Sequence, residues 1–455
     1  VTDTDTLERC RAALGRLASG DAPSPESDRI DLPLVGRGEV IAEAVRALRS
    51  EDRRIVLTGP SGVGLTRTLG SVTAWILSEL DDLVIASATC SYSGKSIAYD
   101  TLNRLFDSEL FRAAHLEVEE PWRSVIARVL RVYGRAPEVE MEPLEGTAAS
   151  LRVLHGISHL IMKAIGNAQL VAVVDDLHLA DPASLTVLTH LGVDGDGAVI
   201  RLLGAARTDT PLDAPTRNLI DREATVIDVA PLAPEASREL LVALRPDLGE
   251  EAIDTVVTLA DGYPRRLLEA SRSIEADSGS LRGATLEGLL RDRLEGLSTD
   301  EQRILGLLSV APDGLSAELL MNATDLGLLD LGRGLTTLEE RGVVASGERL
   351  RIRSSFLREQ IRAGLPVSIE AALHRSIART LMRVEPPPAS SIGTHLSDAG
   401  DHQEAVGWLV RGAREAAQAE AFSVAIELLD RALAGVGPEA LGDRKSTRLN
   451  SSHYS

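Results

Sequence analysis

Short apolar runs alternate with amphipathic stretches over the first half of the chain. Apolar residues recur at helical spacing over 39–48, 101–133 and 149–165. Apolar runs with the length of buried strands lie at the start of 54–69 and over 83–89, 170–174, 198–206 and 226–229. Continuous apolar strands that alternate with helices are typical of a parallel sheet covered on both faces. The pattern therefore predicts a doubly wound α/β domain over 33–232, with ligands at the carboxyl ends of the strands.

The second half of the chain is helical in pattern. Helical spacing over 237–245, 250–260 and 264–276 predicts an all-α lid at 233–297. Residues 298–384 are expected to form a winged helix. Its helices are predicted at 301–311, 316–323 and 331–342, and its hairpin over 343–353, with a turn at Ser346-Gly347.

The last third ends in alanine-rich helices. A proline-bearing linker is expected at 385–391, and residues 392–442 follow it. There the segment AGDHQEAV at 399–406 is faintly repeated as AEAFSVAI at 419–426. This repeat is compatible with tetratricopeptide-like (TPR-like) helices.

The two ends of the chain are expected to stand apart from these domains. Residues 1–32 are predicted to form a short helix and a linker. The segment DRKSTRLNSSH, within 443–455, resembles the translation of a common sequencing-library adapter. We therefore expect 443–455 to be an artefact, and the natural protein to continue beyond 442.

The turn after the first strand fits the phosphate-binding loop G-x-x-x-x-G-K-[ST] at every fixed position except one. Its residues are Gly59, Pro60, Ser61, Gly62, Val63, Gly64, Leu65 and Thr66. Glycines let backbone N–H groups surround phosphate oxygens, and the Thr66 hydroxyl is placed to bind Mg²⁺. Leu65 stands where a lysine would neutralise the phosphates. A glycine-rich turn that serves only packing is the alternative interpretation.

A second candidate feature is the strand LVAVVDD at 170–176, which ends in two acids. This pattern matches a Walker B strand, in which Asp175 would hold Mg²⁺ and Asp176 would polarise the attacking water. The alternative is a buried strand that ends in two solvated acids. Arg207 follows the next strand, and it is either a ligand of the γ-phosphate or an exposed arginine.

Composition narrows the class of protein. The formal net charge of −20 argues against a nucleic-acid-binding surface over the bulk of the chain. Two cysteines without a pairing or metal pattern, and no leader-like N-terminus, favour a reduced, cytoplasmic setting. No apolar run approaches the ~20 residues needed to span a bilayer, so no membrane partner is expected.

Several segments together resemble one family. Leu34-Val35-Gly36-Arg37, the loop, VVDDLHLADPAS at 173–184, AARTD at 205–209 and Asp261-Gly262-Tyr263-Pro264 resemble the signal-transduction ATPases with numerous domains (STAND), most closely large LuxR-type transcriptional regulators. The resemblance covers about 33–436. It implies a P-loop NTPase switch loaded with ATP or ADP and Mg²⁺. The cofactor-binding positions that it implies are Gly36, Arg37, 59–66, Arg67, Arg207 and Pro264, with Thr66 and Asp175 as metal ligands and Asp176 as the catalytic carboxylate.

The resemblance also implies partners. The helical repeats would sense an inducer or a partner protein, and DNA would be bound only by a helix-turn-helix domain that is absent from this sequence. A ligand-dependent oligomer is a further expectation.

Two positions depart from the family. Leu65 replaces its lysine, and Ser354 stands where it has a histidine near the β-phosphate. Three hypotheses remain open: a regulatory core that binds nucleotide weakly and hydrolyses little or none, an active ATPase switch, and a non-catalytic scaffold.

Overall fold

The computed structural model describes most of the chain. The described residues are 34–50, 53–79, 83–134, 147–166, 168–191, 200–272, 285, 288, 293–345, 347, 349–419 and 421–435. The predicted N-terminal helix and linker at 1–32 and the adapter-like segment at 443–455 lie outside these residues. Residues 135–146 lie outside them as well.

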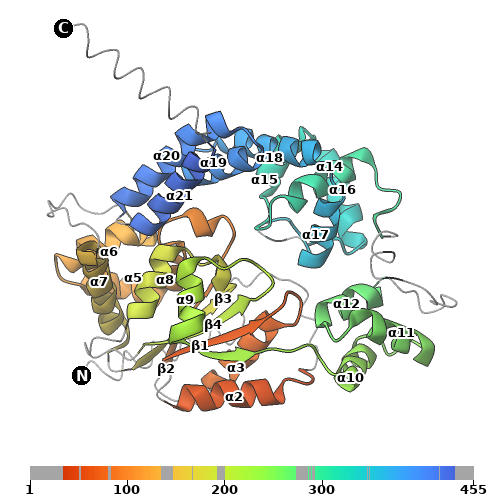
Figure 1. Ribbon diagram of the computed structural model, residues 1–455, viewed down its shortest axis with the longest axis horizontal. Coiled ribbons are helices and arrows are strands. Elements are labelled where there is room, and N and C mark those ends of the chain that lie inside the picture. Colours follow the sequence, from red (N-terminus) through yellow and green to blue (C-terminus); the bar gives the residue numbers. More distant parts are fainter. Residues whose placement is uncertain are drawn as a thin grey trace, which may run out of the picture.

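Five parallel strands form the central sheet, in the order β2-β3-β4-β1-β5 (Figure 1). Their bounds are β1 Arg54–Gly59, β2 Leu83–Thr89, β3 Gln169–Asp175, β4 Ile200–Arg207 and β5 Thr225–Asp228. All five predicted strands are confirmed to within about two residues. Six of the seven residues of β3 are buried, as expected for a central strand that consists of apolar residues.

Helices cover both faces of this sheet. On one face, α2 (Gly38–Arg49) and α3 (Leu65–Glu79) pack against alternate residues of the strands, such as Leu57 of β1. On the other face, α7 (Thr147–Ile165) and α8 (Pro182–His190) pack against the intervening residues, such as Val56. This alternation follows from the two-residue period of a strand and confirms the doubly wound architecture.

The helical stretch predicted at 101–133 is broken into separate helices. They are α4 (Asp100–Leu105), α5 (Glu109–Glu117) and α6 (Trp122–Val129). One break has a local cause, because the Ser108 side chain accepts a hydrogen bond from the N–H of Phe111 and caps α5. Helical periodicity alone did not reveal this break.

The helices that follow the sheet lie close to their predicted positions. They are α10 (Pro234–Leu244), α11 (Glu250–Ala260) and α12 (Pro264–Arg272). Asp261 and Gly262 have φ of 48° and 73° and separate the last two. The Gly262 carbonyl accepts a hydrogen bond from the N–H of Leu232, which ties this turn to the segment that leaves the sheet.

A second core lies beneath the next helices. These are α14 (Thr299–Ser309), α15 (Ala317–Thr324), α16 (Leu328–Glu340), α17 (Ser355–Ala363) and α18 (Val367–Leu381). Between α16 and α17, β6 (Val344–Ala345) and β7 (Arg351–Ile352) pair antiparallel, where the sequence predicts a hairpin. This core is continuous with that of α10–α12.

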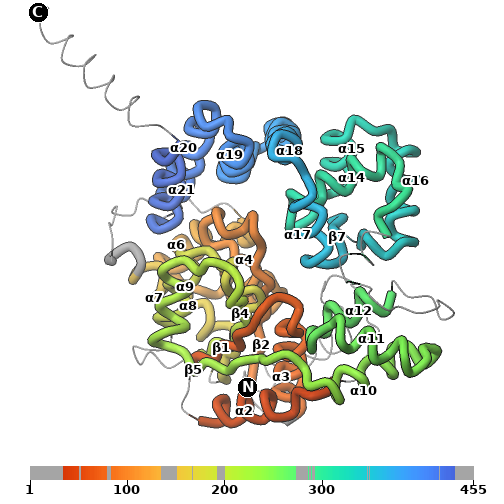
Figure 2. Tube along the Cα trace, turned by 45° about the vertical axis from the view of Figure 1, so that its right-hand side comes forward, coloured from red at the N-terminus to blue at the C-terminus, as the bar shows by residue number. Residues whose placement is uncertain are grey.

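The chain ends in three packed helices, α19 (Ala389–Asp398), α20 (His402–Gln418) and α21 (Phe422–Ala434). The linker expected at 385–391 is therefore too long by three residues, because α19 begins at Ala389. Figure 2 shows α18–α21 arching back over the sheet domain. Residues of α19–α21 share a core with α8, so this segment is packed on the sheet domain. Within the described ranges, no helix combines the length and apolar character that crossing a membrane requires.

Candidate functional site

A tight turn joins β1 to α3 and contains the predicted phosphate-binding loop. Gly62 and Gly64 have φ of 81° and 102°, which favour glycine. Gly59 leaves no room for a side chain, because an added Cβ would lie 2.8 Å from the carbonyl oxygen of Val229. The Val63 side chain is fully buried. The glycines of the motif are therefore required by the conformation of the turn.

The helix end of this loop offers backbone donors. In the part of the chain that the structure describes, no protein group accepts a hydrogen bond from the N–H of Gly64, Leu65 or Thr66. These residues lead into a helix of 15 residues, whose N-terminal end carries partial positive charge. Such an arrangement fits the phosphates of a nucleotide.

Leu65 makes the loop less cationic than a P-loop with its lysine. Its side chain is half-buried and packs against the core between α3 and the sheet. The loop accordingly offers an apolar group where an ammonium would meet the phosphates.

Thr66 and Asp175 meet at the end of β3. The Thr66 hydroxyl donates a hydrogen bond to the Asp175 carboxylate, which also accepts one from the N–H of Asp176 at 2.9 Å. Burial raises the pKa of Asp175, and these hydrogen bonds oppose that rise. One hydroxyl and one carboxylate side by side form an oxygen donor set that fits Mg²⁺.

Asp176 lies next to this pair in a left-handed conformation, with φ of 52°. Burial and the neighbouring charge of Asp175 raise the pKa of Asp176 to about 7, against the opposing influence of Arg207. A carboxylate with a pKa near neutrality is suited to exchange a proton with water.

Arg207 lies beside the loop because it pairs with Gly59 across strands β4 and β1. Its Nε donates to Oδ1 of Asp209 at 3.0 Å, and its Nη2 donates to Oδ2 at 3.2 Å. Its Nη2 also lies 3.7 Å from Oε1 of Glu359 on α17. The predicted arginine therefore faces the site, but two carboxylates already surround it.

The other predicted cofactor residues divide into two groups. Arg37 is buried and donates to the carbonyl oxygens of Ala230 at 2.5 Å and Val63 at 2.7 Å. Its guanidinium therefore connects the loop to the segment that follows β5. Gly36 faces α10, where an added Cβ would lie 3.0 Å from the Cβ of Ala236. Arg67 is exposed on the first turn of α3.

Pro264 approaches the loop from α12, since its Cγ lies 3.9 Å from the position that a Cβ of Gly64 would take. The next residue, Arg265, donates its backbone N–H to the Gly62 carbonyl at 3.2 Å. The structure thus places Arg37 and Pro264 against the loop, and Arg265 is a neighbour that the sequence reasoning missed.

Ser354 stands at the position where the family has a histidine near the β-phosphate, but in this structure its side chain caps a helix. Its side chain is fully buried and accepts a hydrogen bond from the N–H of Leu357, so it caps α17. The next residue, Ser355, faces the loop instead, with its Oγ 3.3 Å from Oγ of Ser61. The sequence carried no signal for this contact.

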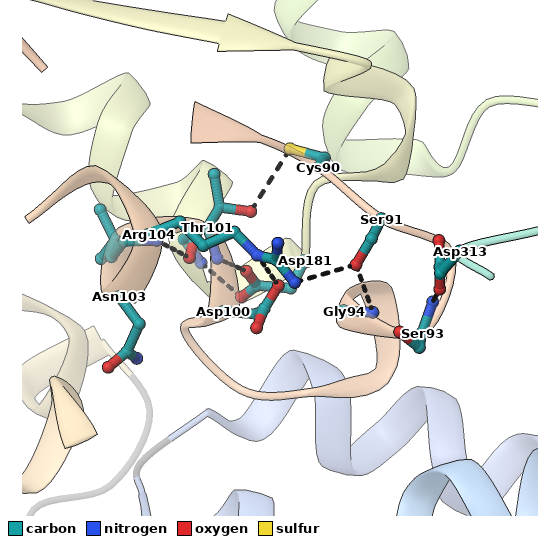
Figure 3. Close-up of polar contacts among 12 residues, drawn as sticks. Cys90, Ser91, Ser93, Gly94, Asp100, Thr101, Asn103, Arg104, Asp181 and Asp313 are labelled. Carbon is teal, nitrogen blue, oxygen red and sulfur yellow. Dashed lines mark hydrogen bonds and ion pairs between the residues drawn. The ribbon is translucent and has the colours of Figure 1, made fainter. Parts of the chain in front are cut away.

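The loop that follows β2 is held by two acids from distant segments (Figure 3). Asp313 accepts hydrogen bonds from the N–H groups of Tyr92 at 2.7 Å and Ser93 at 2.5 Å. Asp181 is fully buried and accepts from the N–H of Tyr99 at 2.9 Å. Both acids organise the backbone beside the site.

Comparisons with known proteins agree with this geometry. The family model of the AAA ATPase domain matches residues 33–203. This part of the chain is thus similar to an AAA ATPase domain, a family whose members use nucleotide and Mg²⁺. No curated protein matches the chain.

Among solved structures, the chain is similar to a STAND protein with a tetratricopeptide repeat sensor from Pyrococcus horikoshii, with a TM-score of 0.51 at 15% identity. The match covers 90% of this chain and 60% of that one, so this chain spans about three fifths of its length. At this identity the likeness concerns the fold alone.

Two further matches are more distant. The ORC1 protein of Aeropyrum pernix in complex with DNA matches at TM-score 0.33 and 16% identity, over 76% of this chain and 94% of that one. A mutant RuvB protein of Thermotoga maritima matches at TM-score 0.30 and 15% identity, over 73% of this chain and 96% of that one. Neither carries an argument about this chain.

Proposed function

We propose that this chain is the regulatory core of a STAND-class, LuxR-type transcriptional regulator, which binds ADP or ATP with Mg²⁺ weakly and hydrolyses ATP slowly or not at all. The observation that carries this proposal is the loop itself. Its helix end keeps open backbone donors and the Thr66–Asp175 pair, whereas Leu65 packs apolar surface where a cation belongs.

Different groups of the chain would bind the phosphates and the metal. The N–H groups of Gly64, Leu65 and Thr66 would hold phosphate oxygens, and Thr66 and Asp175 would hold Mg²⁺. Mg²⁺ held by these residues would neutralise negative charge on the phosphates. Because the lysine is missing, the charge that develops during phosphoryl transfer is poorly compensated. We therefore expect the chain to bind nucleotide but to hydrolyse it slowly or not at all.

The remaining segments suit the role of a regulator. Helices α14–α18 with their hairpin are proposed as a winged-helix lid, and support comes from the Ser61–Ser355 and Arg207–Glu359 contacts across to the loop. Helices α19–α21 are proposed as the start of a TPR-like sensor for an inducer or partner protein. DNA would be bound by a domain outside this sequence.

A second candidate function is an active ATPase switch. The specific observation in its favour is Asp176, because a pKa of about 7 suits a general base at neutral pH. The two functions differ in whether ATP is turned over.

The test restores the missing cation. Leu65→Lys is compared with the unmodified chain and with Leu77→Lys, the same change at an exposed position of the same helix. Binding of ADP with Mg²⁺ is measured by calorimetry. A charge-assisted contact contributes about 1.5–3 kcal/mol, so we expect at least a tenfold lower Kd for Leu65→Lys and no change for Leu77→Lys.

Circular dichroism of each variant checks that the fold is kept. If neither the unmodified chain nor a folded Leu65→Lys variant binds ADP at millimolar concentration, this loop does not form a nucleotide site and the proposal fails.

A further inference from the structure

Asp209 occupies the end of the loop opposite to α3. It lies two residues beyond β4, and its Oδ2 accepts a hydrogen bond from the backbone N–H of Ser61 at 3.1 Å. The same carboxylate accepts both hydrogen bonds from the Arg207 guanidinium, at 3.0 and 3.2 Å. One internal anion therefore uses a backbone donor of the loop and the arginine expected to reach the γ-phosphate.

This carboxylate is charged at neutral pH. Burial alone would raise the pKa of Asp209, but the hydrogen bonds from Arg207 and from the Ser61 N–H outweigh burial and hold the pKa below its ordinary value. Its side chain is 39% exposed, so an incoming anion can reach it and displace it.

The two ends of the loop thus differ. At the helix end, the N–H groups of Gly64, Leu65 and Thr66 have no acceptor among the described residues. These are the groups that hold the inner phosphates of a nucleotide. At the other end, Asp209 accepts the hydrogen bonds of the Ser61 N–H and of the Arg207 guanidinium. A terminal phosphate that reaches toward Arg207 and Asp176 meets this end of the loop, whereas a diphosphate does not.

We propose that Asp209 is a specificity-determining residue, whose carboxylate holds the place of a terminal phosphate, so that the site takes a nucleoside diphosphate in preference to a triphosphate. This inference rests on the function proposed above and adds the phosphate number of its ligand. It follows from charge: without the lysine, the cation expected to meet a terminal phosphate is Arg207, and Asp209 and Glu359 already neutralise it.

The same contacts connect the loop to α17. Glu359 approaches Arg207, and Ser355 approaches Ser61, the two residues that Asp209 joins. A triphosphate would have to displace the Asp209 carboxylate from both Ser61 and Arg207. Its binding is therefore opposed by the contacts that keep α17 on the loop.

The test removes one charge and keeps the shape. Asp209→Asn leaves an amide oxygen that can still accept from the Ser61 N–H, and Asp209→Ala removes the group altogether. The matched control is Asp330→Asn, because Asp330 also pairs with a nearby arginine, Arg333 at 3.0 Å, but lies on α16. ADP and a non-hydrolysable ATP analogue, AMP-PNP, are titrated with Mg²⁺ against the full chain and each variant by calorimetry.

We expect the unmodified chain and Asp330→Asn to bind ADP at least tenfold more tightly than AMP-PNP. Asp209→Asn or Asp209→Ala should bind AMP-PNP at least tenfold more tightly than before, with the Kd for ADP changed less than threefold. The titrations are repeated in the Leu65→Lys background, where stronger binding is expected, and there only the effect of the Asp209 variants on AMP-PNP relative to ADP is compared, because the added lysine itself alters the preference.

The outcomes separate the two proposals. If ADP binds but the Asp209 variants change ADP and AMP-PNP equally, or change neither, Asp209 does not select against the terminal phosphate while the nucleotide site stands. If the unmodified chain prefers AMP-PNP, the inference is likewise wrong. If ADP binds neither the unmodified chain nor Leu65→Lys, both proposals fall.

Discussion

Asp175 and Asp176 place two carboxylates at adjacent positions at the end of β3, where burial opposes the charge of both. In a P-loop protein that binds Mg²⁺, the metal relieves this opposition. The positions of the acids were predictable, because an acidic pair after an apolar strand is a contiguous pattern. Their altered pKa values were not, since they depend on what packs around the strand end in three dimensions.

Replacing Asp176 by asparagine tests this burial at the residue scale. A pKa raised to about 7 means that the folded state favours the protonated acid, so the stabilising contribution is complete below the ordinary pKa and is lost as pH rises toward about 7. Asparagine does not titrate, so the Asp176→Asn variant does not lose this contribution to stability as pH rises. Relative to the unmodified chain, its free energy of unfolding should rise between pH 5 and pH 8 by on the order of 2 kcal/mol.

The measurement is urea unfolding without Mg²⁺ at the two pH values, and Asp330→Asn is the exposed control. Parallel pH dependence of Asp176→Asn and the unmodified chain would show that Asp176 is not held in a site that disfavours its charge.

At the scale of elements, apolar runs and helical periodicity located the strands and most helices. They did not locate the ends that depend on single side chains, as the cap of Ser108 on α5 shows. Proline content suggested a linker up to 391, but α19 begins at Ala389, directly after Pro388. The close packing of α19 on α20 could not be predicted either, because the sequence does not show whether a glycine inside a helix allows a close contact or has no role in packing.

Two glycines of α20 allow a glycine in a close contact to be compared with a glycine that has none. An added Cβ at Gly412 would lie 3.0 Å from the backbone nitrogen of Ser390 on α19, whereas one at Gly407 meets nothing within 4 Å. Gly412→Ala should therefore destabilise the fold by about 1–3 kcal/mol. Gly407→Ala should stabilise it by about 0.5–1 kcal/mol, because alanine favours the helix.

Thermal unfolding followed by circular dichroism compares the two variants with the unmodified chain. Equal shifts for both would contradict the close contact of α19 with α20.

At the scale of the whole molecule, the site is assembled from segments far apart in the sequence. The loop and the acid pair were predictable, because each is a short contiguous motif. Asp209 and Ser355 were not, because only the folded chain brings them to Ser61. Asp313, which holds the loop after β2, likewise belongs to a segment more than two hundred residues away. The sequence thus predicted the loop and the acid pair as motifs, but not the contacts that Asp209 and Ser355 make with the loop.

The central claim is that this assembly binds nucleotide without turning it over. Phosphate release from ATP with Mg²⁺, at saturating ATP and with the full chain, tests it most directly. Because Leu65 supplies no charge to the transition state, we predict release indistinguishable from that of Asp176→Asn. Turnover at an ordinary rate of about 1 per second or faster, abolished in Asp176→Asn, would contradict the account and establish an active ATPase.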